Sequence, residues 1–436
     1  INGLLAPDRT VKPAMYECKY VFQPIAFEPV DPAQGRIRVV NRNFFSSTDV
    51  YDYKWELRDE NHVLQSGTLA VPTAPGESVE ISVPYKPFRQ IPGAEYWLRL
   101  SAYEAQERPY AEAGWKVAAE QLKISALSAL RRDLPQGRVV VREYADSLLF
   151  TSGSAKIVIS RSSGYLTSCS LDGCPAICGP LKPDFWRAAT DNDRRGWKTD
   201  VLLDFWKHAE KRMTVKDLTV SKESGRVVVT VGKSIPDTLS LTLTYTIGGG
   251  GAVEVGYALR HLNPQLPEML RVGMQMQCGA DYDRMMFYGR GPHENYSDRC
   301  LSAFVSVYDG HVDDFRYDYV RPQENGNRTG VRWLCLRNAA GRGVQFIGRQ
   351  PLSVAVRRCS PEALEEAGHA SEAECSSDRL TVNIDLVQAG VGGTDSWSIK
   401  ARPEMPYRLC EKVYNYGFLI VPGQASDCIR NGRMYR

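Results

Sequence analysis

Acidic side chains gather in a few polar, glycine-containing segments of the sequence, and these segments are the first candidates for chemistry. The segment 186–197 places Asp191 and Asp193 two residues apart, the spacing with which a helix-flanked calcium loop begins. Such a loop also needs oxygen ligands at its fifth and twelfth positions, which Arg195 and Leu202 occupy here. The sequence therefore excludes this type of calcium site. We expect the two carboxylates to form an Asx-rich turn that caps a following helix.

Two further polar segments, 288–299 and 321–330, also carry groups that could move protons. His293 and Glu294 are adjacent in the first segment, but neighbouring side chains on a strand point to opposite faces, so they are not expected to act as a pair. The amide-rich second segment is interpreted as a turn region. In the first segment, three polar side chains are expected to stabilise a Gly-Pro turn: Glu294, Asn295 and Asp298.

None of the Asp and Glu residues stands in a context that singles out a catalytic pair, although a glycosidase needs two carboxyl groups roughly 5–9.5 Å apart. The sequence has no G-x-S-x-G elbow, P-loop or H-E-x-x-H motif, and its 6 histidines never occur at metal-ligand spacing. The closest cysteines, Cys174 and Cys178, have no second pair near them that would complete a zinc site. We therefore assign no catalytic residue and no metal ligand to this chain.

The segment 390–397, with the sequence GVGGTDSW, differs from the others because it ends in a large aromatic side chain. The small residues from Gly390 to Gly393 force a tight backbone course, after which Asp395 and Ser396 precede Trp397. A tryptophan after such a turn more often anchors a core or an interface than a ligand. Its expected place on a loop nevertheless favours a functional role.

The elements that must position these segments are predicted to be strands. In the first part of the chain, apolar residues alternate with polar ones at 36–40, 79–83 and 97–100, which puts one face of each run in a core. Several such runs in little more than a hundred residues indicate an immunoglobulin-like sandwich over residues 1–124. The small, charged stretch at 125–137 ends in Pro and Gly, and we predict a linker over 125–142.

Residues 143–436 are predicted to form a second, larger all-β domain. Its alternating runs include 226–231, 239–245, 253–255 and 380–386, and four glycines at 248–251 fit a hairpin connection. Only 201–212 has the spacing of a helix. Because the chain lacks alternating βα units, no (β/α)₈ barrel can be built from it.

Composition indicates a soluble globular protein whose partners carry little charge. Hydrophobic residues make up 43% and charged residues 24%, and the net charge is only +3. No dense basic block stands out, which argues against nucleic acid and against an anionic membrane surface. The odd number of 11 cysteines does not indicate a disulfide framework, and most are expected to be small buried apolar residues.

The N-terminal residues include neither a signal peptide nor an initiator methionine. The chain starts at Ile1 with no signal peptide, and its first methionine is Met15, so we interpret it as a processed product or an excised piece. A cytoplasmic and a periplasmic location both stay open.

Taken together, the segments resemble the C-terminal half of glycoside hydrolase family 2 β-galactosidases. Residues 2–25 are similar to the stretch that leaves the catalytic barrel and enters the immunoglobulin-like fourth domain, although Val11 stands where that family has a proline. The four polar segments then follow in the order seen in the large fifth domain, at 186–197, 289–299, 321–330 and 390–397. The resemblance implies an all-β chain: an immunoglobulin-like sandwich followed by a large antiparallel supersandwich.

The resemblance also implies that the chemistry lies elsewhere. In this family the two catalytic glutamates, the Mg and Na ions and most galactose contacts belong to the barrel, and no Asn-Glu dipeptide like that of the acid/base residue occurs here. The implied partners are that TIM-barrel part, the galactoside substrate and further copies in a homo-oligomer. No nucleic acid, membrane or cofactor is expected in this chain.

Two site residues are carried over from the family. Trp397 matches the tryptophan that stacks on sugar at the mouth of the active-site pocket, and so is expected to bind substrate. Gly196 matches a hinge in a loop that moves on substrate binding. Two arginines, Arg194 and Arg195, precede it here where the family has one residue.

The main hypothesis is therefore a non-catalytic C-terminal portion of a retaining β-galactosidase that completes the active-site rim and forms subunit contacts. A genuine small subunit that assembles with a separate barrel chain is a related possibility. The alternatives from other classes are a stand-alone carbohydrate-binding, lectin-like protein and an adhesin made of stacked β domains.

Overall fold

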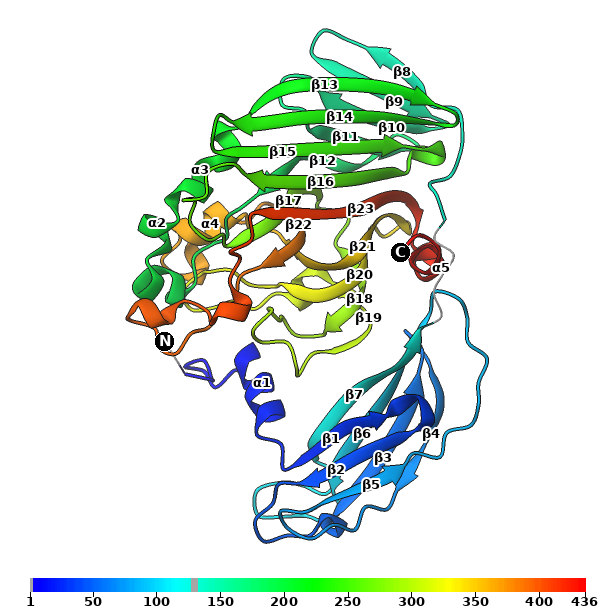
Figure 1. Ribbon diagram of the computed structural model, residues 1–436, viewed down its shortest axis with the longest axis vertical. Coiled ribbons are helices and arrows are strands. Elements are labelled where there is room, and N and C mark those ends of the chain that lie inside the picture. The colour runs from blue at the N-terminus through cyan, green and yellow to red at the C-terminus, as the bar shows by residue number, and fades with distance from the viewer. Residues whose placement is uncertain (1–2, 127–131) are drawn as a thin grey trace.

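Two antiparallel β structures make up the chain, of which the computed structural model describes residues 3–126 and 132–436 (Figure 1). Residues 127–131 of the predicted linker and Asn2 of the N-terminal segment lie outside the described residues. The strands before residue 126 form one structure, shown in blue and cyan, and the later strands form the other.

The first structure is a sandwich of a three-stranded and a four-stranded sheet. The three-stranded sheet has the order β1 (Ile25–Asp31), β2 (Arg36–Asn41), β5 (Ser78–Ser82). The four-stranded sheet has the order β4 (Val63–Leu69), β3 (Tyr51–Arg58), β6 (Glu95–Glu104), β7 (Lys116–Ala126). The inward faces of both sheets share one apolar core that contains Ile37, Trp55 and Leu98. The three runs predicted as strands fall on β2, β5 and β6.

The second structure is a single 16-stranded antiparallel sheet. Its main path is β13-β14-β15-β16-β23-β21-β22-β17-β12-β11-β10-β9-β8, and β20, β18 and β19 branch from β21. The strands are β8 (Val140–Glu143), β9 (Ser147–Ser152), β10 (Ala155–Ser160), β11 (Leu166–Leu171), β12 (Cys174–Asp184), β13 (Thr214–Glu223), β14 (Arg226–Ile235), β15 (Leu239–Ile247), β16 (Val253–His261), β17 (Arg271–Gly279), β18 (Arg284–Gly291), β19 (Phe304–His311), β20 (Arg328–Arg337), β21 (Arg342–Arg357), β22 (Arg379–Gln388) and β23 (Val413–Gln424).

The large sheet curls so that distant strands share one core. Leu148 on β9, Val231 on β14 and Ile384 on β22 belong to the same cluster of buried apolar side chains. Along β15, buried and half-buried residues alternate without a break from Leu239 to Ile247, as the sequence pattern predicts for a strand with one apolar face. The predicted all-β fold, an immunoglobulin-like sandwich followed by a large antiparallel supersandwich, is confirmed.

The helices differ from the prediction. The expected helix at 201–212 is divided into α2 (Thr199–Leu202) and α3 (Asp204–Arg212), because the buried Leu203 between them leaves helical geometry. Three other α-helices were missed: α1 (Pro13–Val21), α4 (Pro361–Glu366) and α5 (Cys428–Tyr435). Only Pro13 of α1 is buried, so that helix has no apolar stripe, and the other two are too short to show a period. No described helix is long and apolar enough to span a membrane.

Short 3₁₀ and π segments connect these elements: η1 (Pro32–Gln34), η2 (Thr48–Val50), η3 (Asp193–Trp197), η4 (Gly249–Gly251), η5 (Val312–Phe315), η6 (Ala370–Glu372), η7 (Ile399–Ala401), η8 (Met405–Tyr407) and η9 (Ala425–Asp427). The connection between the two β structures runs from β7, which ends at Ala126, to β8, which begins at Val140. The domain division at 1–124, 125–142 and 143–436 stays a prediction.

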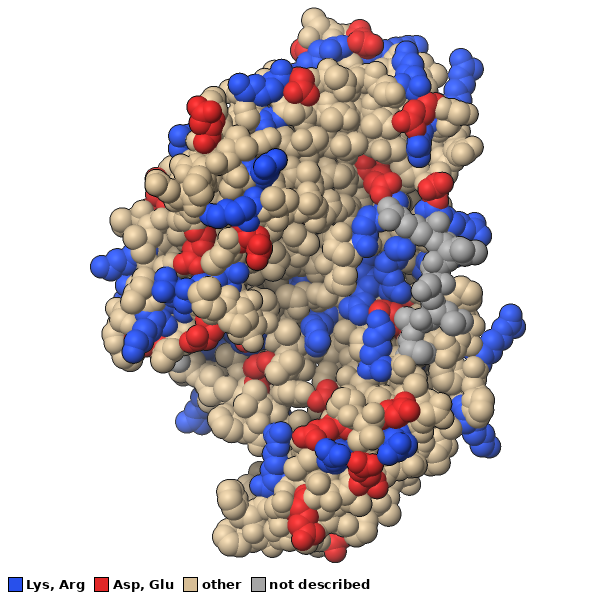
Figure 2. All heavy atoms as spheres, viewed as in Figure 1, with Lys and Arg blue, Asp and Glu red and all other residues tan. Residues whose placement is uncertain are grey.

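The junction of the two structures centres on Glu95 of β6. Its carboxylate accepts hydrogen bonds from Tyr288 (2.9 Å) and Arg332 (2.7 Å) of the large sheet, and it pairs with Lys123 (2.6 Å). Arg436, at the end of α5, approaches the same carboxylate at 3.3 Å. Basic side chains gather where α5 meets the first sandwich (Figure 2). Burial alone would raise the pKa of Glu95, but these positive charges outweigh it and lower the pKa to about 2.

Replacing Glu95 tests this junction. Because the pKa in the folded protein lies below the ordinary 4.5, the carboxylate stabilises the fold fully above pH 4.5, and this contribution is lost as the pH falls toward 2. We expect Glu95→Gln to lower the free energy of unfolding by about 3 kcal/mol at pH 7 and to flatten its pH dependence between 4.5 and 2. Urea titrations at a series of pH values measure both effects.

Glu80 supplies the matched control. It pairs with Arg36 and Arg38 on an exposed strand surface, where solvent screens an ion pair and its contribution to stability is small. An effect of Glu95→Gln no larger than that of Glu80→Gln would contradict the role assigned to Glu95.

Candidate functional site

Trp397 lies on the loop that follows β22, and its side chain is 76% exposed. The backbone beneath it is held by the carboxylate of Asp395, which accepts hydrogen bonds from the N–H groups of Trp397 (3.2 Å) and Ser398 (3.0 Å) and from the Ser398 hydroxyl (2.6 Å). The hydrogen bonds from Ser398 lower the pKa of Asp395. A fixed backbone therefore presents a large aromatic ring to solvent.

The segment 288–299 holds the glycine-rich start of this loop through Asp298. Its Oδ2 accepts hydrogen bonds from the N–H groups of Val391 and Gly392, both at 2.8 Å. A Cβ at Gly390 would lie 2.5 Å from the same oxygen, so only glycine allows the backbone to approach. The glycines at 390–393 thus serve a close carboxylate contact in addition to the turn predicted from the sequence.

The segment 186–197 holds the same loop from below through Arg187. The guanidinium of Arg187 donates to the carbonyls of Ala389 (2.6 Å) and Gly390 (2.9 Å) and makes two 2.9 Å hydrogen bonds to the carboxylate of Asp193. Arg187 and Asp193 are 0% and 1% exposed. Burial lowers the pKa of Arg187, but Asp193 outweighs this effect, so the pKa is raised and the guanidinium stays charged.

The predicted role of Asp191 and Asp193 as caps of the following helix is wrong. Neither α2 nor α3, which together occupy the predicted helix, has a side-chain hydrogen bond at its N-cap. Asp193 binds Arg187 and the N–H of Thr190 (3.0 Å) instead, and Asp191 lies 3.5 Å from the amide of Gln323. The acidic spacing therefore reflects one buried ion pair and one contact to the segment 321–330.

Asn192 and Gly196 connect the same segment to the far side of the Trp397 loop. The Asn192 amide donates to the carbonyls of Asp395 and Ala401, both at 3.1 Å. A Cβ on Gly196 would lie 2.0 Å from the Cβ of Ala401 and 2.5 Å from the carbonyl of Ser398. Gly196 therefore allows η3 to pack directly on η7. Its role as a hinge stays a prediction.

The segment 321–330 lies under the end of β22, just before the loop begins. Glu324 accepts hydrogen bonds from Arg357 (3.2 Å) and Gln388 (3.3 Å), and Gln388 also donates to Asn327 (3.1 Å). Gln388 is the last residue of β22. All four polar segments thus contribute to one structure whose exposed tip is Trp397.

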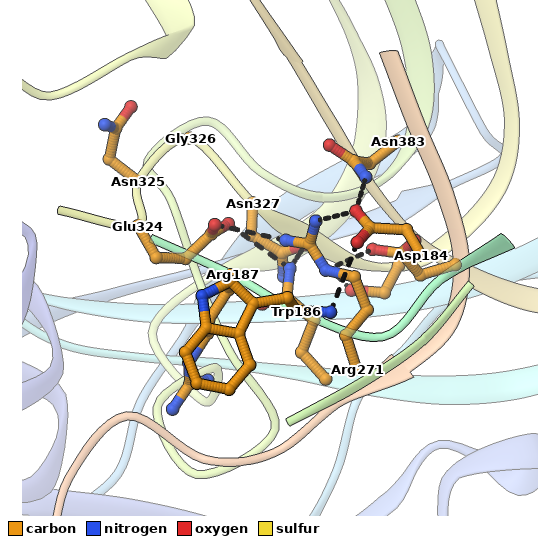
Figure 3. Close-up of polar contacts among 12 residues, drawn as sticks. Asp184, Trp186, Arg187, Arg271, Glu324, Asn325, Gly326, Asn327 and Asn383 are labelled. Atoms are coloured by element: carbon orange, nitrogen blue, oxygen red, sulfur yellow. Dashed lines mark hydrogen bonds and ion pairs between the residues drawn. The ribbon is translucent and has the colours of Figure 1, made fainter. Parts of the chain in front are cut away.

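A buried cluster of charges surrounds Glu324 (Figure 3). Arg271 lies 2.7 Å from Asp184, 3.1 Å from Glu324 and 3.4 Å from Asp385. Burial raises the pKa of Asp385 well above 3.8; Arg271 opposes this effect, and the nearby charges of Asp184 and Glu324 add to it. Burial would also raise the pKa of Glu324, but Arg357 and Arg271 outweigh it and lower the pKa.

Asp184 and Glu324 bind arginines and amides, and Asp385 lies beside Arg271 without a hydrogen bond, so we interpret the three carboxyl groups as a structural cluster. Within residues 3–126 and 132–436, no group of three or more His, Cys, Asp or Glu side chains is placed to hold a metal ion.

His293 and Glu294 have separate partners, as expected for neighbouring side chains that point to opposite faces. Glu294 binds Arg299 (2.8 Å), Tyr319 (2.5 Å) and the N–H of Gly326 (2.7 Å), whereas His293 lies 2.8 Å from the hydroxyl of Ser302. The turn itself is stabilised by Asn295, whose amide donates to the carbonyls of Arg290 (3.1 Å) and His293 (3.0 Å). Asn295 therefore has the role expected of it, while Glu294 and Asp298 fasten the turn to other segments.

One covalent link near the site was missed. Cys359 and Cys375 form a disulfide that closes the excursion containing α4. The carbonyl of Glu365 in α4 accepts a hydrogen bond from Arg194 (3.1 Å), and its carboxylate accepts one from Trp186 (3.3 Å). Of the nine free cysteines four are buried, fewer than expected. With 11 cysteines and no framework spacing, nothing in the sequence distinguished this pair.

Removing the Asp298 carboxylate should loosen the loop without affecting the sheet. In Asp298→Ala the N–H groups of Val391 and Gly392 lose their acceptor, and hydrogen bonds to a charged group contribute about 1.5–3 kcal/mol. We expect amide hydrogen exchange at 391–397 to accelerate by tenfold or more, with β17 unchanged. Glu223, whose carboxylate pairs with Arg226 on an exposed surface, is the control. Equal exchange rates at 391–397 in Asp298→Ala and Glu223→Ala would show that the Asp298 carboxylate does not hold the loop.

Gly196→Ala tests whether this glycine is required by packing. The added methyl group overlaps Ala401, so the free energy of unfolding should fall by about 1–3 kcal/mol, and exchange at 398–401 should accelerate. The double variant Gly196→Ala/Ala401→Gly removes the nearest overlapping atom and should recover part of the loss. If Gly196→Ala leaves both quantities unchanged, close packing is not its role.

Two family models match the chain. Residues 37–125 match the model described as β-galactosidase domain 4, and residues 151–420 match the β-galactosidase small chain model. A β-galactosidase of Priestia megaterium is 31% identical over 425 residues, which cover 97% of this chain and 41% of that protein. A β-galactosidase of Halalkalibacterium halodurans is 29% identical and is matched over 92% of this chain and 40% of its own length.

Among solved structures, a galactose 1-epimerase of Lactobacillus acidophilus matches 67% of this chain and 99% of its own, with a TM-score of 0.39 and 10% identity, values too low to support an inference. The chain spans about 40% of the length of the curated relatives above. The domain 4 and small chain matches together cover most of its residues. By these matches, the chain belongs to the β-galactosidase small chain family.

Proposed function

We propose that this chain is the non-catalytic C-terminal portion of a retaining β-galactosidase, which hydrolyses terminal β-D-galactosides such as lactose. The catalytic glutamates and the Mg and Na sites belong to a barrel outside this chain. The observation that carries the proposal is that four separate segments converge on one loop and that this loop exposes a tryptophan to solvent. A fold gains no core packing from such a construction, because the Trp397 ring is 76% exposed.

Trp397 acts by stacking on substrate. The flat face of an indole matches the apolar face of a pyranose, and such aromatic contacts contribute about 1 kcal/mol. A contact of this size orients a sugar and adds affinity but breaks no bond. In the complete enzyme the Trp397 loop therefore forms part of the rim of the active-site pocket.

Exposed apolar surface elsewhere supports contact with the absent part of the enzyme. Phe22, Phe44 and Phe45 are 81%, 88% and 96% exposed, and together with Val21 they line one shallow depression. A cluster of exposed aromatic rings is characteristic of a surface that another protein part covers. We assign this depression to the barrel part or to a second subunit of the complete enzyme.

Calorimetric titration of the isolated chain with lactose, together with a chromogenic galactoside assay, distinguishes the proposal from its alternative. Since Trp397 supplies only one face of a site, we expect no binding tighter than about millimolar and no hydrolysis. Measurable binding that Trp397→Ala abolishes would show a stand-alone lectin. Hydrolysis that is lost on replacing a single glutamate of this chain would contradict the non-catalytic assignment.

The positive test joins the chain to a barrel. In a chimera, this chain replaces the matching 41% of the Priestia megaterium enzyme. Trp397→Ala should then raise KM for lactose roughly fivefold, the equivalent of about 1 kcal/mol, with little change in kcat. Trp115, which is 54% exposed on the first sandwich, is the matched control, and its replacement by Ala should leave KM unchanged.

A further inference from the structure

A second feature of the molecule lies away from Trp397, between the two β structures. A cavity of about 670 Å³ opens there. Its walls come from α1, from β6 and β7 of the first sandwich, and from the region around β18, β19 and η5 of the large sheet. Glu17 attaches α1 to the large sheet beside the cavity, because its carboxylate accepts hydrogen bonds from the N–H groups of Leu301 and Ser302, both at 2.9 Å.

The wall of this cavity carries an excess of positive charge. Two acidic side chains line it: Glu294, which pairs with Arg299 (2.8 Å), and Asp314, which accepts a hydrogen bond from the N–H of His311 (2.8 Å). His293 adds no charge, because burial and the nearby Arg328 lower its pKa to about 4. Five basic side chains line the same cavity: Lys19, Arg99, Lys116, Arg316 and Arg328. Of these, Arg316 pairs with Asp313 (3.7 Å) and Asp318 (3.2 Å), and the other four are in no ion pair among the described residues.

Arg99 is the basic group that most lacks a partner. In the described part of the chain its Nε is buried without a hydrogen-bond acceptor, and no ion pair includes its guanidinium. The guanidinium lies 5.3 Å from the centre of the Phe304 ring. Burial, with the charge of Arg58 beside it, lowers the pKa of Arg99. Glu56, the cross-strand neighbour of Arg99 on β3, pairs with Arg58 and only partly opposes this shift. An anion in the cavity would supply the acceptor that the Nε of the half-buried Arg99 lacks.

Lys19 and Lys116 add two exposed positive charges at the side formed by α1 and β7. Burial and the charge of Lys116 lower the pKa of Lys19, so the two ammonium groups repel each other. Arg328 also lacks a carboxylate partner, since it donates only to the carbonyls of Pro292 (2.8 Å), Phe315 (2.7 Å) and Asn327 (3.3 Å).

The remaining wall is aromatic. Tyr16 of α1 stacks on His293 with 4.7 Å between ring centres. The other rings that line the cavity are those of Tyr20, Phe304, Tyr308, Phe315 and Tyr317. Flat apolar walls beside an unpaired guanidinium suit a ligand with a ring-shaped body and one negative group.

We propose that this cavity binds a small organic anion, a ring compound that carries a carboxylate or a phosphate, with the anionic group on Arg99 and the ring against the aromatic wall. The site is separate from the galactoside function and does not depend on it. Because both β structures line the cavity, the bound anion links them, and its binding energy adds to the stability of their junction.

Calorimetric titration of the full chain tests the proposal with four probes: benzoate, phenyl phosphate, inorganic phosphate and neutral benzyl alcohol. We expect benzoate or phenyl phosphate to bind and to raise the unfolding temperature. Benzyl alcohol, which lacks the charge, and inorganic phosphate, which lacks the ring, should bind at least tenfold more weakly. Failure of both ring anions to bind, or equal affinity for the neutral or the ring-free probe, would overturn the proposal.

Variants locate the site. Arg99→Gln should weaken binding of the ring anion at least tenfold, whereas Arg99→Lys, which keeps the charge, should lose less. Arg89, exposed on the first sandwich and outside the cavity wall, is the control, and Arg89→Gln should bind as the unmodified chain does. Circular dichroism confirms that each variant is folded. Unchanged affinity in folded Arg99→Gln or Arg99→Lys, or an equal loss in Arg89→Gln, would place the anion elsewhere.

Discussion

The ion pair between Arg187 and Asp193 is the interaction on which the candidate site depends. Both side chains are buried. The guanidinium also donates hydrogen bonds to the carbonyls of Ala389 and Gly390, where β22 ends and the Trp397 loop begins. Breaking a buried pair by removing one partner typically costs about 3–5 kcal/mol, because the other charge is left unpaired. One pair therefore fixes both the segment 186–197 and the loop that it supports.

The other contacts around this pair also connect distant segments to the Trp397 loop. Asn192 and Asp298 bind the Trp397 loop from two different segments, and Asn327 of a third accepts a hydrogen bond from Gln388 at its base. Two glycines permit the close approach of the chain. The buried charges around Arg271 and Glu324 contribute a rigid base beneath them (Figure 3). Such polar clusters add little net stability compared with apolar packing, but they tolerate few alternative arrangements. We interpret them as the means by which an exposed ring keeps a defined position.

The strands were predictable from the sequence because each contains its own alternation of apolar and polar residues. The alternation at 239–245 is local, and the residues of β15 alternate in burial as the pattern requires. The division of the 201–212 helix at Leu203 and the presence of α1 were not predictable, since they depend on packing that no local period records.

The candidate site was predictable only in part. Its four segments and Trp397 could be identified from motifs, but their convergence joins residues far apart, such as Asn192 and the carbonyl of Asp395, separated by 203 positions. Arg187 stands inside one of the motifs, yet nothing in its neighbourhood indicates that Asp193 and two distant carbonyls are its partners. The cap assigned to the acidic turn was wrong for the same reason, because Asp193 binds the buried guanidinium of Arg187 and the preceding N–H of Thr190 instead of the helix that follows.

A double-mutant cycle between Arg187 and Trp397 tests the central claim most directly. In the galactosidase chimera, KM for lactose is measured for Arg187→Lys, Trp397→Ala and the double variant. Lysine keeps the charge beside Asp193 but cannot hold both loop carbonyls. If Arg187 acts through the position of Trp397, Arg187→Lys raises KM alone but adds almost nothing once Trp397 is removed. Fully additive effects, or an unchanged KM in Arg187→Lys, would contradict the account.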